Sequence, residues 1–335
     1  MKGKSKYIAV IIFVLVCVLI WFGFQLMRPP AQGAIRICDF SCDSAQVHNR
    51  IAGFIVEHGM GYDSEYIPGD TIMLNTAMMQ DDVDINMESW TENIQDLYDK
   101  MIKSGKVADL GSNFSDNWQG WLVPTYMIKG DAKRGIKPMA PDLKSVSDLP
   151  KYWKLFKDPE VPTKGRFYNS IPGWGCTKIN STKLKTYGLD KYFNDFITGS
   201  DAALSGSMAA AVKKGKPWVG YYWEPTWVLG KLDMTRLEEP SFNQKIWDTD
   251  KGCTYGSVTI NILVNTKLFK SAPDVVEMLR KYETTTAMVN KILANMMDTK
   301  GSTEDGAVWF LKNRADVWTK WVSADVAGKV KAALK

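Results

Sequence analysis

The chain has 335 residues, of which 45% are hydrophobic and 24% are charged, which is the composition of a soluble globular protein. These values exclude a disordered chain, a collagen-like repeat and a polytopic membrane protein. The net charge is +5, but four basic residues precede residue 34, so the rest of the chain is near neutral. The part of the chain after residue 33 therefore lacks the excess of basic residues that is typical of nucleic-acid-binding proteins, and no nucleic-acid partner is expected. With His48 and His58 as the only histidines, a three-histidine metal site is excluded.

The first 33 residues are expected to lie outside the fold. Three lysines precede an uncharged, strongly apolar run of 18 residues from 7 to 24. This pattern is that of a signal peptide or of a single membrane anchor, followed by a short linker. Small residues before Ala34 suit cleavage by a signal peptidase, so both alternatives stay open. Either one places the lysines in the cytoplasm and the body of the protein outside the membrane, anchored or secreted.

The body begins with a regular alternation of strands and helices. Three buried strands are predicted from short runs of apolar residues, at 34–39, 62–67 and 83–87. Three helices follow these strands in turn, at 43–58, 70–80 and 91–104. Asp43 or Ser44 is the expected N-cap of the first helix, and Gly59 its expected end. The alternation favours a mainly parallel sheet with helices on both faces.

A second α/β unit follows a strand-like crossing at 120–129. Its predicted strands lie at 166–169 and 219–223, and its predicted helices at 177–186 and 200–214. A further strand at 257–264 is followed by helical patterns at 270–282, 283–297 and 316–334.

Two such units predict an α/β fold of two lobes, each a mixed, mostly parallel sheet flanked by helices. Residues 34–125 and 257–335 are assigned to lobe I, and residues 126–256 to lobe II. Ligands of open α/β sheets bind at the carboxyl ends of the strands. The crevice between the lobes is therefore the expected binding site.

The cysteines give no metal site and no unique disulfide pattern. Cys38, Cys42, Cys176 and Cys253 follow the apolar run, and four cysteines can pair in three ways. No CxxC pair occurs, and the histidine-poor surroundings do not suit zinc. We expect neither a metal nor a cofactor.

Motifs of the common enzyme classes are absent, since the chain holds no P-loop, no GxGxxG after a strand, no GxSxG and no HExxH. What stands out is 13 tryptophans, of which Trp90, Trp174 and Trp223 lie at the ends of predicted strands or in glycine-rich loops. An indole face attracts a cation, so several indoles around one pocket suit a quaternary ammonium group. The competing interpretation is ordinary hydrophobic packing.

The turn into the first predicted helix offers a second candidate contact. Backbone amides near Ser44 and Ala45 would point out of the positive end of that helix, where a carboxylate binds well. The simpler alternative is that this sequence only caps the helix.

These stretches together resemble the glycine betaine/proline-betaine substrate-binding proteins of ABC transporters, which have the type II periplasmic-binding-protein fold. The resemblance covers nearly everything after residue 34. It rests on the segments DSAQVHNRIAGFIVEHG, NMESWTENI, NWQGWLVPTYMIKG, IPGWGC, GSDAAL and YYWEPTWVLGKLDMTRLEEP.

The resemblance implies an aromatic box at Trp90, Trp174 and Trp223, with Trp227 as a substitute for the last. It further implies carboxylate-holding amides at Ser44 and Ala45, and a further cage aromatic at Tyr126.

Two positions in the first loop bear on the ligand. Cys42 stands where relatives often carry an aromatic residue, so the cage is open there or takes a larger ligand such as carnitine. Choline-selecting relatives carry an acidic residue where Ser44 stands, with Asp43 beside it. Glycine betaine, proline betaine, carnitine and choline therefore all remain candidates.

The implied function is an extracytoplasmic binding protein, not an enzyme, that delivers a quaternary ammonium solute to an ABC transporter permease. Two other interpretations remain open at this point. A secreted or anchored sugar-binding protein or glycoside hydrolase would stack sugars on the tryptophans and use Glu88 and Glu224 as a carboxylate pair. An anchored sensor or adhesion domain would need no transporter.

Overall fold

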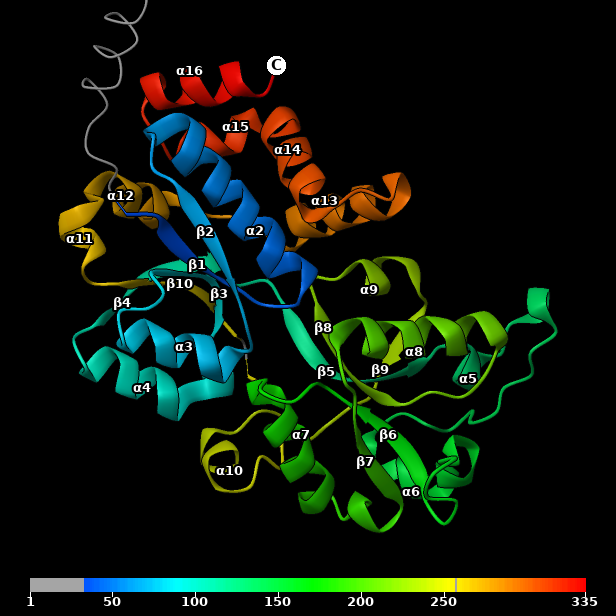
Figure 1. Ribbon diagram of the computed structural model, residues 1–335. Helices are drawn as coiled ribbons and strands as arrows, with labels where there is room; N and C mark the ends of the chain where they lie inside the picture. Colours follow the sequence, from blue (N-terminus) through cyan, green and yellow to red (C-terminus); the bar gives the residue numbers. More distant parts are fainter. Residues whose placement is uncertain (1–32, 257) are drawn as a thin grey trace, which may run out of the picture.

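The computed structural model describes residues 33–256 and 258–335. The expected signal peptide or anchor therefore lies almost wholly outside the described residues. No helix in the described ranges has both the length and the apolar character needed to cross a bilayer. The chain forms two α/β lobes, each built on a five-stranded mixed sheet, as Figure 1 shows. The predicted two-lobed fold is confirmed.

The sheet of lobe I has the strand order β2-β1-β3-β10-β4. Its strands are β1 (Ile35–Asp39), β2 (Ser64–Pro68), β3 (Ile85–Trp90), β4 (Val107–Phe114) and β10 (Ile260–Asn265). β1 is parallel to β2 and β3, whereas β10 is antiparallel to β3 and β4. Four strands therefore run one way and β10 runs the other, which agrees with the predicted mostly parallel sheet.

Lobe II repeats this plan with the order β7-β6-β8-β5-β9. Its strands are β5 (Trp118–Pro124), β6 (Gly165–Asn169), β7 (Phe193–Ile197), β8 (Gly220–Glu224) and β9 (Met234–Arg236). Here β5 is the single antiparallel strand, between β8 and β9. In each lobe the reversed strand is the one that the chain enters directly after crossing from the other lobe.

Helices pack on both faces of each sheet. Those of lobe I are α2 (Asp43–Phe54), α3 (Thr71–Met79), α4 (Gln95–Lys103), α11 (Leu268–Ser271), α12 (Pro273–Lys281), α13 (Thr286–Thr299), α14 (Thr303–Asn313), α15 (Ala315–Trp318) and α16 (Ala324–Ala333). A π-helical turn, η1 (Ile55–Met60), continues α2, and a 3-10 turn, η2 (Thr91–Ile94), precedes α4. Figure 1 shows α13 to α16 gathered beside α2, so the end of the chain completes lobe I.

Among its described residues, lobe II has two long helices, of 12 and 14 residues, and otherwise helices of four to six residues. They are α5 (Tyr126–Lys129), α6 (Leu149–Tyr152), α7 (Gly175–Thr186), α8 (Asp201–Lys214), α9 (Trp227–Lys231) and α10 (Gln244–Thr249). The 3-10 turns η3 (Ala132–Arg134), η4 (Val146–Asp148), η5 (Trp153–Phe156) and η6 (Leu189–Lys191) lie between them. α7 and α8 begin at the edge of the sheet that faces lobe I, and this places their first turns near the cleft.

The expected lobe boundary at residue 125 needs correction. The segment Trp118–Pro124 is β5, which pairs with β8 from Trp118↔Glu224 to Leu122↔Gly220 and so belongs to the second sheet. Trp121 is fully buried in the core of lobe II. The crossing therefore lies between Phe114 and Trp118. The return crossing lies just before β10, close to the expected position.

Several short elements differ from the prediction. β4, β7 and β9 were not predicted, because their sequences, VADLGSNF, FNDFI and MTR, mix polar and apolar residues without clear alternation. The helix expected at 316–334 is two helices, since the chain turns between Trp318 and Ala324.

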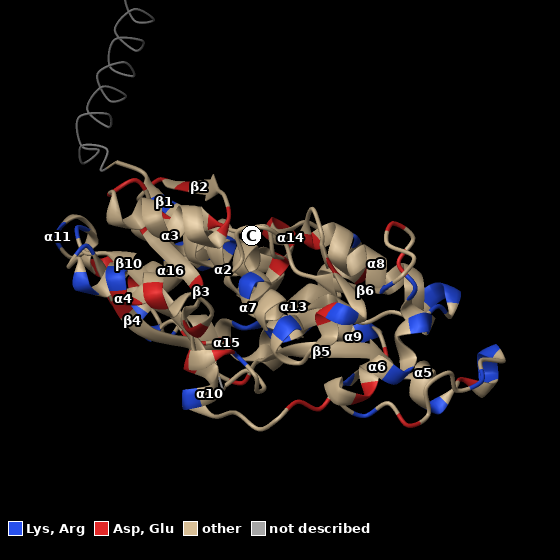
Figure 2. Cartoon of the chain, turned by 90° about the horizontal axis from the view of Figure 1, so that it is seen from below, with Lys and Arg blue, Asp and Glu red and all other residues tan. Residues whose placement is uncertain are grey.

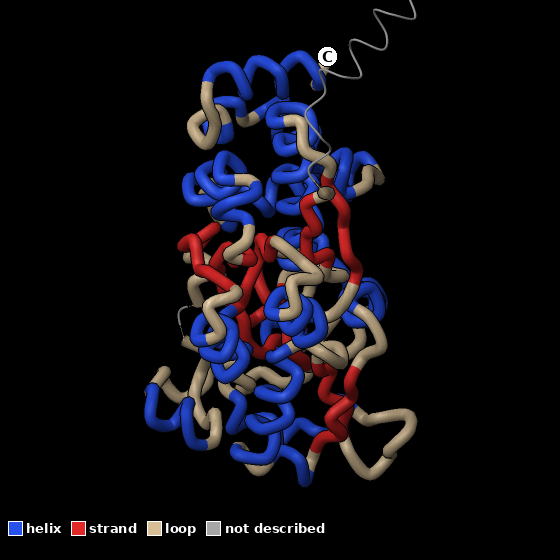
Figure 3. The backbone as a smooth tube through the Cα atoms, turned by 60° about the vertical axis from the view of Figure 1, so that its left-hand side comes forward, coloured by secondary structure: helices blue, strands red, loops and turns tan. Residues whose placement is uncertain are grey.

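Each lobe has its own hydrophobic core, lobe I has a second cluster to which α3 and α4 contribute, and a small cluster joins the end of β4 to the start of β10. Figure 3 shows the strands of the two sheets enclosed by helices in both halves of the molecule. Figure 2 shows acidic and basic residues interspersed along the chain in both lobes.

Candidate ligand-binding site

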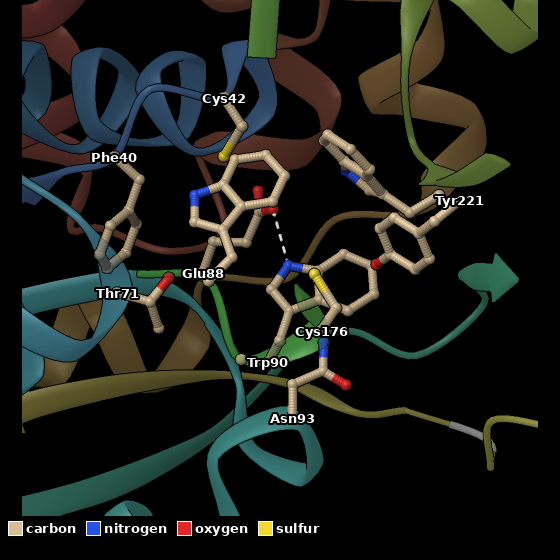
Figure 4. A pocket seen from close by; sticks show the side chains of 11 residues that line it. Phe40, Cys42, Thr71, Glu88, Trp90, Asn93, Cys176 and Tyr221 are labelled. Atoms are coloured by element: carbon tan, nitrogen blue, oxygen red, sulfur yellow. Dashed lines mark hydrogen bonds between the residues drawn. The ribbon is translucent and has the colours of Figure 1, made fainter. Parts of the chain in front are cut away.

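An aromatic cavity lies between the lobes, at the carboxyl ends of β1, β3, β6 and β8. Figure 4 shows its labelled side chains. Its lining residues come from both lobes: Phe40, Cys42, Thr71, Glu88, Trp90, Asn93, Trp174, Gly175, Cys176, Tyr221 and Trp223. The crevice position agrees with the rule for open α/β sheets. We call this space the aromatic cavity.

The three tryptophans expected from the sequence all line this cavity. Trp90 is the last residue of β3 in lobe I, whereas Trp174 and Trp223 belong to lobe II. The Trp174 and Trp223 rings meet edge to face, with centroids 4.9 Å apart and an interplanar angle of 82°. Indole surfaces from both lobes therefore border the same space, as the hypothesis of an aromatic box requires.

Tyr221 adds a fourth aromatic wall that the sequence reasoning did not single out. Its ring lies 6.1 Å from the Trp223 ring, at 23°. The alternation of β8 explains this placement, because residues two apart in a strand point to the same face. Applied to Trp223, that rule could have identified Tyr221. Phe40 was also missed, although it directly follows the first strand.

The loop that carries Trp174 reaches lobe I through two glycines. Gly173 has φ +85°, and a Cβ there would lie 2.4 Å from Cγ of Asp70. A Cβ on Gly175 would lie 2.2 Å from the carbonyl oxygen of Asn93. The Ile72 amide also donates to the Gly173 carbonyl at 3.4 Å. Only glycines allow this approach, which places Trp174 against the other lobe.

Side-chain amides join the lobes beside the cavity. Asn93 Nδ2 donates to Gln119 Oε1 at 3.1 Å, and Gln119 Nε2 donates back to Asn93 Oδ1 at 3.1 Å. The Tyr221 hydroxyl donates to the same Gln119 oxygen at 2.8 Å. A backbone contact and a reciprocal amide pair therefore hold the two lobes together at this edge of the site.

Glu88 places a buried carboxyl group in the cavity. Its Oε1 accepts from the Ser44 hydroxyl at 3.0 Å and from the Trp90 indole N–H at 3.0 Å. Its Oε2 has no hydrogen-bond partner among the described residues. Burial raises the pKa of Glu88 to about 7, although both donors favour the ionised form. The Glu88 carboxyl group is thus poised to change charge near neutral pH.

The space is sized for a small solute. The cavity volume is about 50 Å³. At about 10–15 Å³ for each water, this space holds about four waters, so it suits a small solute. An oligosaccharide does not fit such a space.

A second, smaller cavity shares Cys42 and Trp223 with the first and brings two carboxyl groups together across the lobes. Asp43 comes from lobe I and Asp201 from the first turn of α8 in lobe II. Burial, together with the neighbouring Asp43, raises the pKa of Asp201 to about 7. The pKa of Asp43 is also raised by burial. We call this space the acidic cavity.

The start of α2 differs from the expected carboxylate site. The Ser44 hydroxyl already donates to Glu88, and the Cys42 side chain, at the N-cap, makes no cap hydrogen bond. The Gln46 amide is bonded to the Cys42 carbonyl at 3.1 Å. Ser44 lines the acidic cavity and Ala45 lines neither, so the two residues expected to hold a carboxylate do not border the aromatic cavity.

Tyr126 lies elsewhere, which corrects its expected place in the cage. It is the first residue of α5 and is buried in the core of lobe II. Its hydroxyl donates to the Lys216 carbonyl at 2.6 Å and to the Ala211 carbonyl at 3.2 Å. Because β5 belongs to lobe II, Tyr126, two residues after its end, is carried away from the aromatic cavity. Trp227, the alternative to Trp223, lines the acidic cavity instead.

The carboxylate pair of the hydrolase interpretation does not share one cavity. Glu224 is paired with Arg236 at 2.6 Å and does not line the aromatic cavity, whereas Glu88 does. The carbohydrate interpretation therefore lacks its two facing acids.

The four cysteines of the described ranges are free thiols. Cys42 and Cys176 line the aromatic cavity from opposite lobes. Burial raises the pKa of Cys176 to about 11, so its thiol stays protonated at neutral pH.

Sequence comparisons find similar proteins that are named as binding proteins for trimethylamine N-oxide or betaines. A trimethylamine N-oxide-binding protein of Pelagibacter ubique (strain HTCC1062) is 23% identical over 272 residues, covering 80% of this chain and 84% of that protein. A glycine betaine/proline betaine-binding periplasmic protein of Escherichia coli (strain K12) is 26% identical over 270 residues, covering 77% of each chain.

Solved structures share the fold. A glycine betaine/L-proline-binding protein from Borrelia burgdorferi superposes with a TM-score of 0.73 at 19% identity, covering 89% of this chain and 99% of that one. A choline-binding protein in complex with choline also gives a TM-score of 0.73, at 18% identity, covering 92% of this chain and 100% of that one.

The family model described as the substrate-binding domain of the ABC-type glycine betaine transport system matches residues 33–313. With most of the chain matched and with the interlobe cavity at the expected sheet edges, this protein belongs to that family of ABC-transporter substrate-binding proteins.

Proposed function

We propose that the protein captures a small quaternary ammonium solute in the aromatic cavity, with the methylated cation against Trp90, Trp174 and Trp223. The single observation that carries this proposal is that indoles from both lobes line one small cavity. Desolvated cation–π contacts contribute about 2 kcal/mol each. Three of them supply about 6 of the roughly 8 kcal/mol that micromolar binding needs.

Capture is coupled to closure of the lobes. A ligand that touches Trp90 of lobe I and both Trp174 and Trp223 of lobe II favours the arrangement in which the lobes meet. The amide pair of Asn93 and Gln119 and the glycine-mediated approach of the 171–176 loop add to the stability of that arrangement.

The closed form then docks on an ABC transporter permease, which receives the solute. We place the protein outside the cytoplasm, either held by its amino-terminal segment or released after cleavage of that segment. Membership of a transport family supports both inferences. Binding and release need no covalent chemistry, so the proposed role is not that of an enzyme.

The candidate ligands are glycine betaine, proline betaine, carnitine and choline, and the named relatives add trimethylamine N-oxide. Isothermal titration of the purified full chain with each compound tests the proposal, with maltose as a control ligand. Saturable binding of at least one onium compound, with quenching or a shift of tryptophan fluorescence, is the expected result. Absence of binding of every onium compound by folded protein would contradict the proposal.

A further inference from the structure

We propose that Glu88 makes this site prefer an onium ligand of net positive charge, such as choline, over a zwitterion with a free carboxylate, such as glycine betaine. The inference rests on the proposed function and specifies the ligand class within it. The preference arises from the charges of the groups around the aromatic cavity. The tryptophans contribute equally to both ligand classes, because both carry the same methylated cation.

The Glu88 carboxyl group borders the space that the ligand is proposed to occupy. Glu88 lines the aromatic cavity together with Trp90, and only one of its two carboxylate oxygens is engaged by the protein. The other oxygen, Oε2, is buried and without a partner among the described residues. A buried carboxylate oxygen without a partner is stabilised by a hydrogen-bond donor or by a cation. A ligand hydroxyl group is such a donor, and an onium group is such a cation.

Other groups near Glu88 do not offset its charge. His48 and Tyr282 form a buried pair at 2.8 Å behind it. Burial lowers the pKa of His48 to about 3, so this imidazole is neutral, and the nearby Glu88 helps to raise the pKa of Tyr282. Glu88 therefore has no cationic partner in this cluster.

The remaining charges nearby are acidic. Asp43 and Asp201 line the adjoining acidic cavity, and the residues that line either cavity include no lysine, arginine or histidine. At the start of α2, which was expected to hold a ligand carboxylate, Ser44 lines the acidic cavity beside Asp43 and Asp201, and neither Ser44 nor Ala45 lines the aromatic cavity. A ligand carboxylate would therefore meet like charges without a cationic side chain to balance them.

The charge of Glu88 gives the two ligand classes opposite pH dependences. A bound cation favours ionised Glu88, so choline affinity should rise as pH increases through about 7. A ligand carboxylate favours protonated Glu88, so betaine affinity should fall over the same interval. Asp43 and Asp201 act in the same direction, because their ionisation also makes the surroundings more negative.

The test is isothermal titration of the full chain with choline and with glycine betaine at pH 6, 7 and 8. Choline is expected to bind at least tenfold more tightly than betaine at pH 8. Glu88→Gln should weaken choline binding at least tenfold and reduce the slope of both pH profiles to the part that Asp43 and Asp201 contribute. Glu65→Gln, at an exposed position of β2, is the matched control and should change neither ligand.

A second variant keeps the test independent of the folding of Glu88→Gln. Ser44→Ala removes one donor to Glu88, so the midpoint of the choline pH profile should move upward, which a merely structural role would not cause. An unmoved midpoint would count against Glu88 as the titrating group.

Different results would contradict the preference for choline and the proposed binding function. Betaine binding as tightly as choline at pH 8, with the ratio unchanged in Glu88→Gln, would overturn the preference and leave the proposed function standing. Absence of binding of both ligands, and of every other onium compound, would overturn the proposed function.

Discussion

Asn93 of lobe I and Gln119 of lobe II exchange two side-chain hydrogen bonds of 3.1 Å each, so their amides form a reciprocal bridge beside the ligand cavity. Because one amide comes from each lobe, we expect a lobe movement that separates them to break this pair. Its free energy therefore adds to the affinity for any ligand that is enclosed by closure.

Replacement of Gln119 by methionine should weaken ligand binding about tenfold, because two neutral hydrogen bonds contribute about 1–3 kcal/mol together. The ligand dissociation rate should rise by a similar factor, as stopped-flow fluorescence can measure. Gln80→Met, at an exposed position after α3, is the control. Equal dissociation rates for wild type and Gln119→Met would show that the bridge does not stabilise the closed form.

Trp174→Ala should weaken binding of the preferred onium ligand by at least tenfold. The variant loses one cation–π contact of about 2 kcal/mol and the edge-to-face contact with Trp223, and each 1.4 kcal/mol corresponds to a factor of ten. Titration calorimetry gives the change in dissociation constant. Trp153→Ala, in η5 and outside the cavity lining, should leave it unchanged. An unaltered affinity of Trp174→Ala would remove this residue from the site.

Asp201→Asn should stabilise the fold only at higher pH. The folded-state pKa of Asp201 is raised to about 7 by burial, above the ordinary value of 3.8, so the wild type loses stability as pH rises from about 4 to about 7. The asparagine variant lacks that loss. Its thermal midpoint should match the wild type near pH 4 and exceed it most at pH 8. Asp82→Asn, at an exposed position, serves as the control, and a constant difference at all pH values would contradict the assignment.

Lys183→Met should be strongly destabilising. The Lys183 ammonium is buried in lobe II against Glu239, which also accepts from the Tyr187 hydroxyl at 2.9 Å. Loss of one partner of a buried ion pair costs about 3–5 kcal/mol, because the other charge stays buried without compensation. Urea unfolding should show that Lys183→Met combined with Glu239→Gln recovers much of this loss.

The exposed pair of Lys329 and Asp325 in α16 provides the comparison for that experiment. Lys329→Met should cost less than about 0.5 kcal/mol. A similar cost for Lys183→Met would show that the buried pair contributes no more than a surface pair.

Regular patterns in the sequence predicted most of the fold. The alternation of apolar strands with capped helices identified β1, β2, β3, β6, β8 and β10 and the two-lobed plan. Trp90, Trp174 and Trp223 were identified because each lies at a strand end or in a loop, where a core tryptophan is unusual. Their convergence on one cavity follows from the topology, which brings the carboxyl ends of the strands together.

Features that depend on tertiary pairing were not predictable. Pairing of β5 with β8 moved the lobe boundary and carried Tyr126 into the core of lobe II. The sequence alone offered Glu88 only as one half of a catalytic pair. Its burial between Ser44 and Trp90 depends on contacts between residues 44 positions apart, and no local pattern reports such contacts.

The first described residues lie beside α11, whereas the cavity begins beyond the other end of β1. At about 3.3 Å for each residue, the strand Ile35–Asp39 separates these two places by about 17 Å. Coupling the protein to a sensor surface through the amino end of β1 would therefore leave the ligand entrance open. A protein tethered through this end could likewise contact a partner protein with its binding-site side while the ligand is bound.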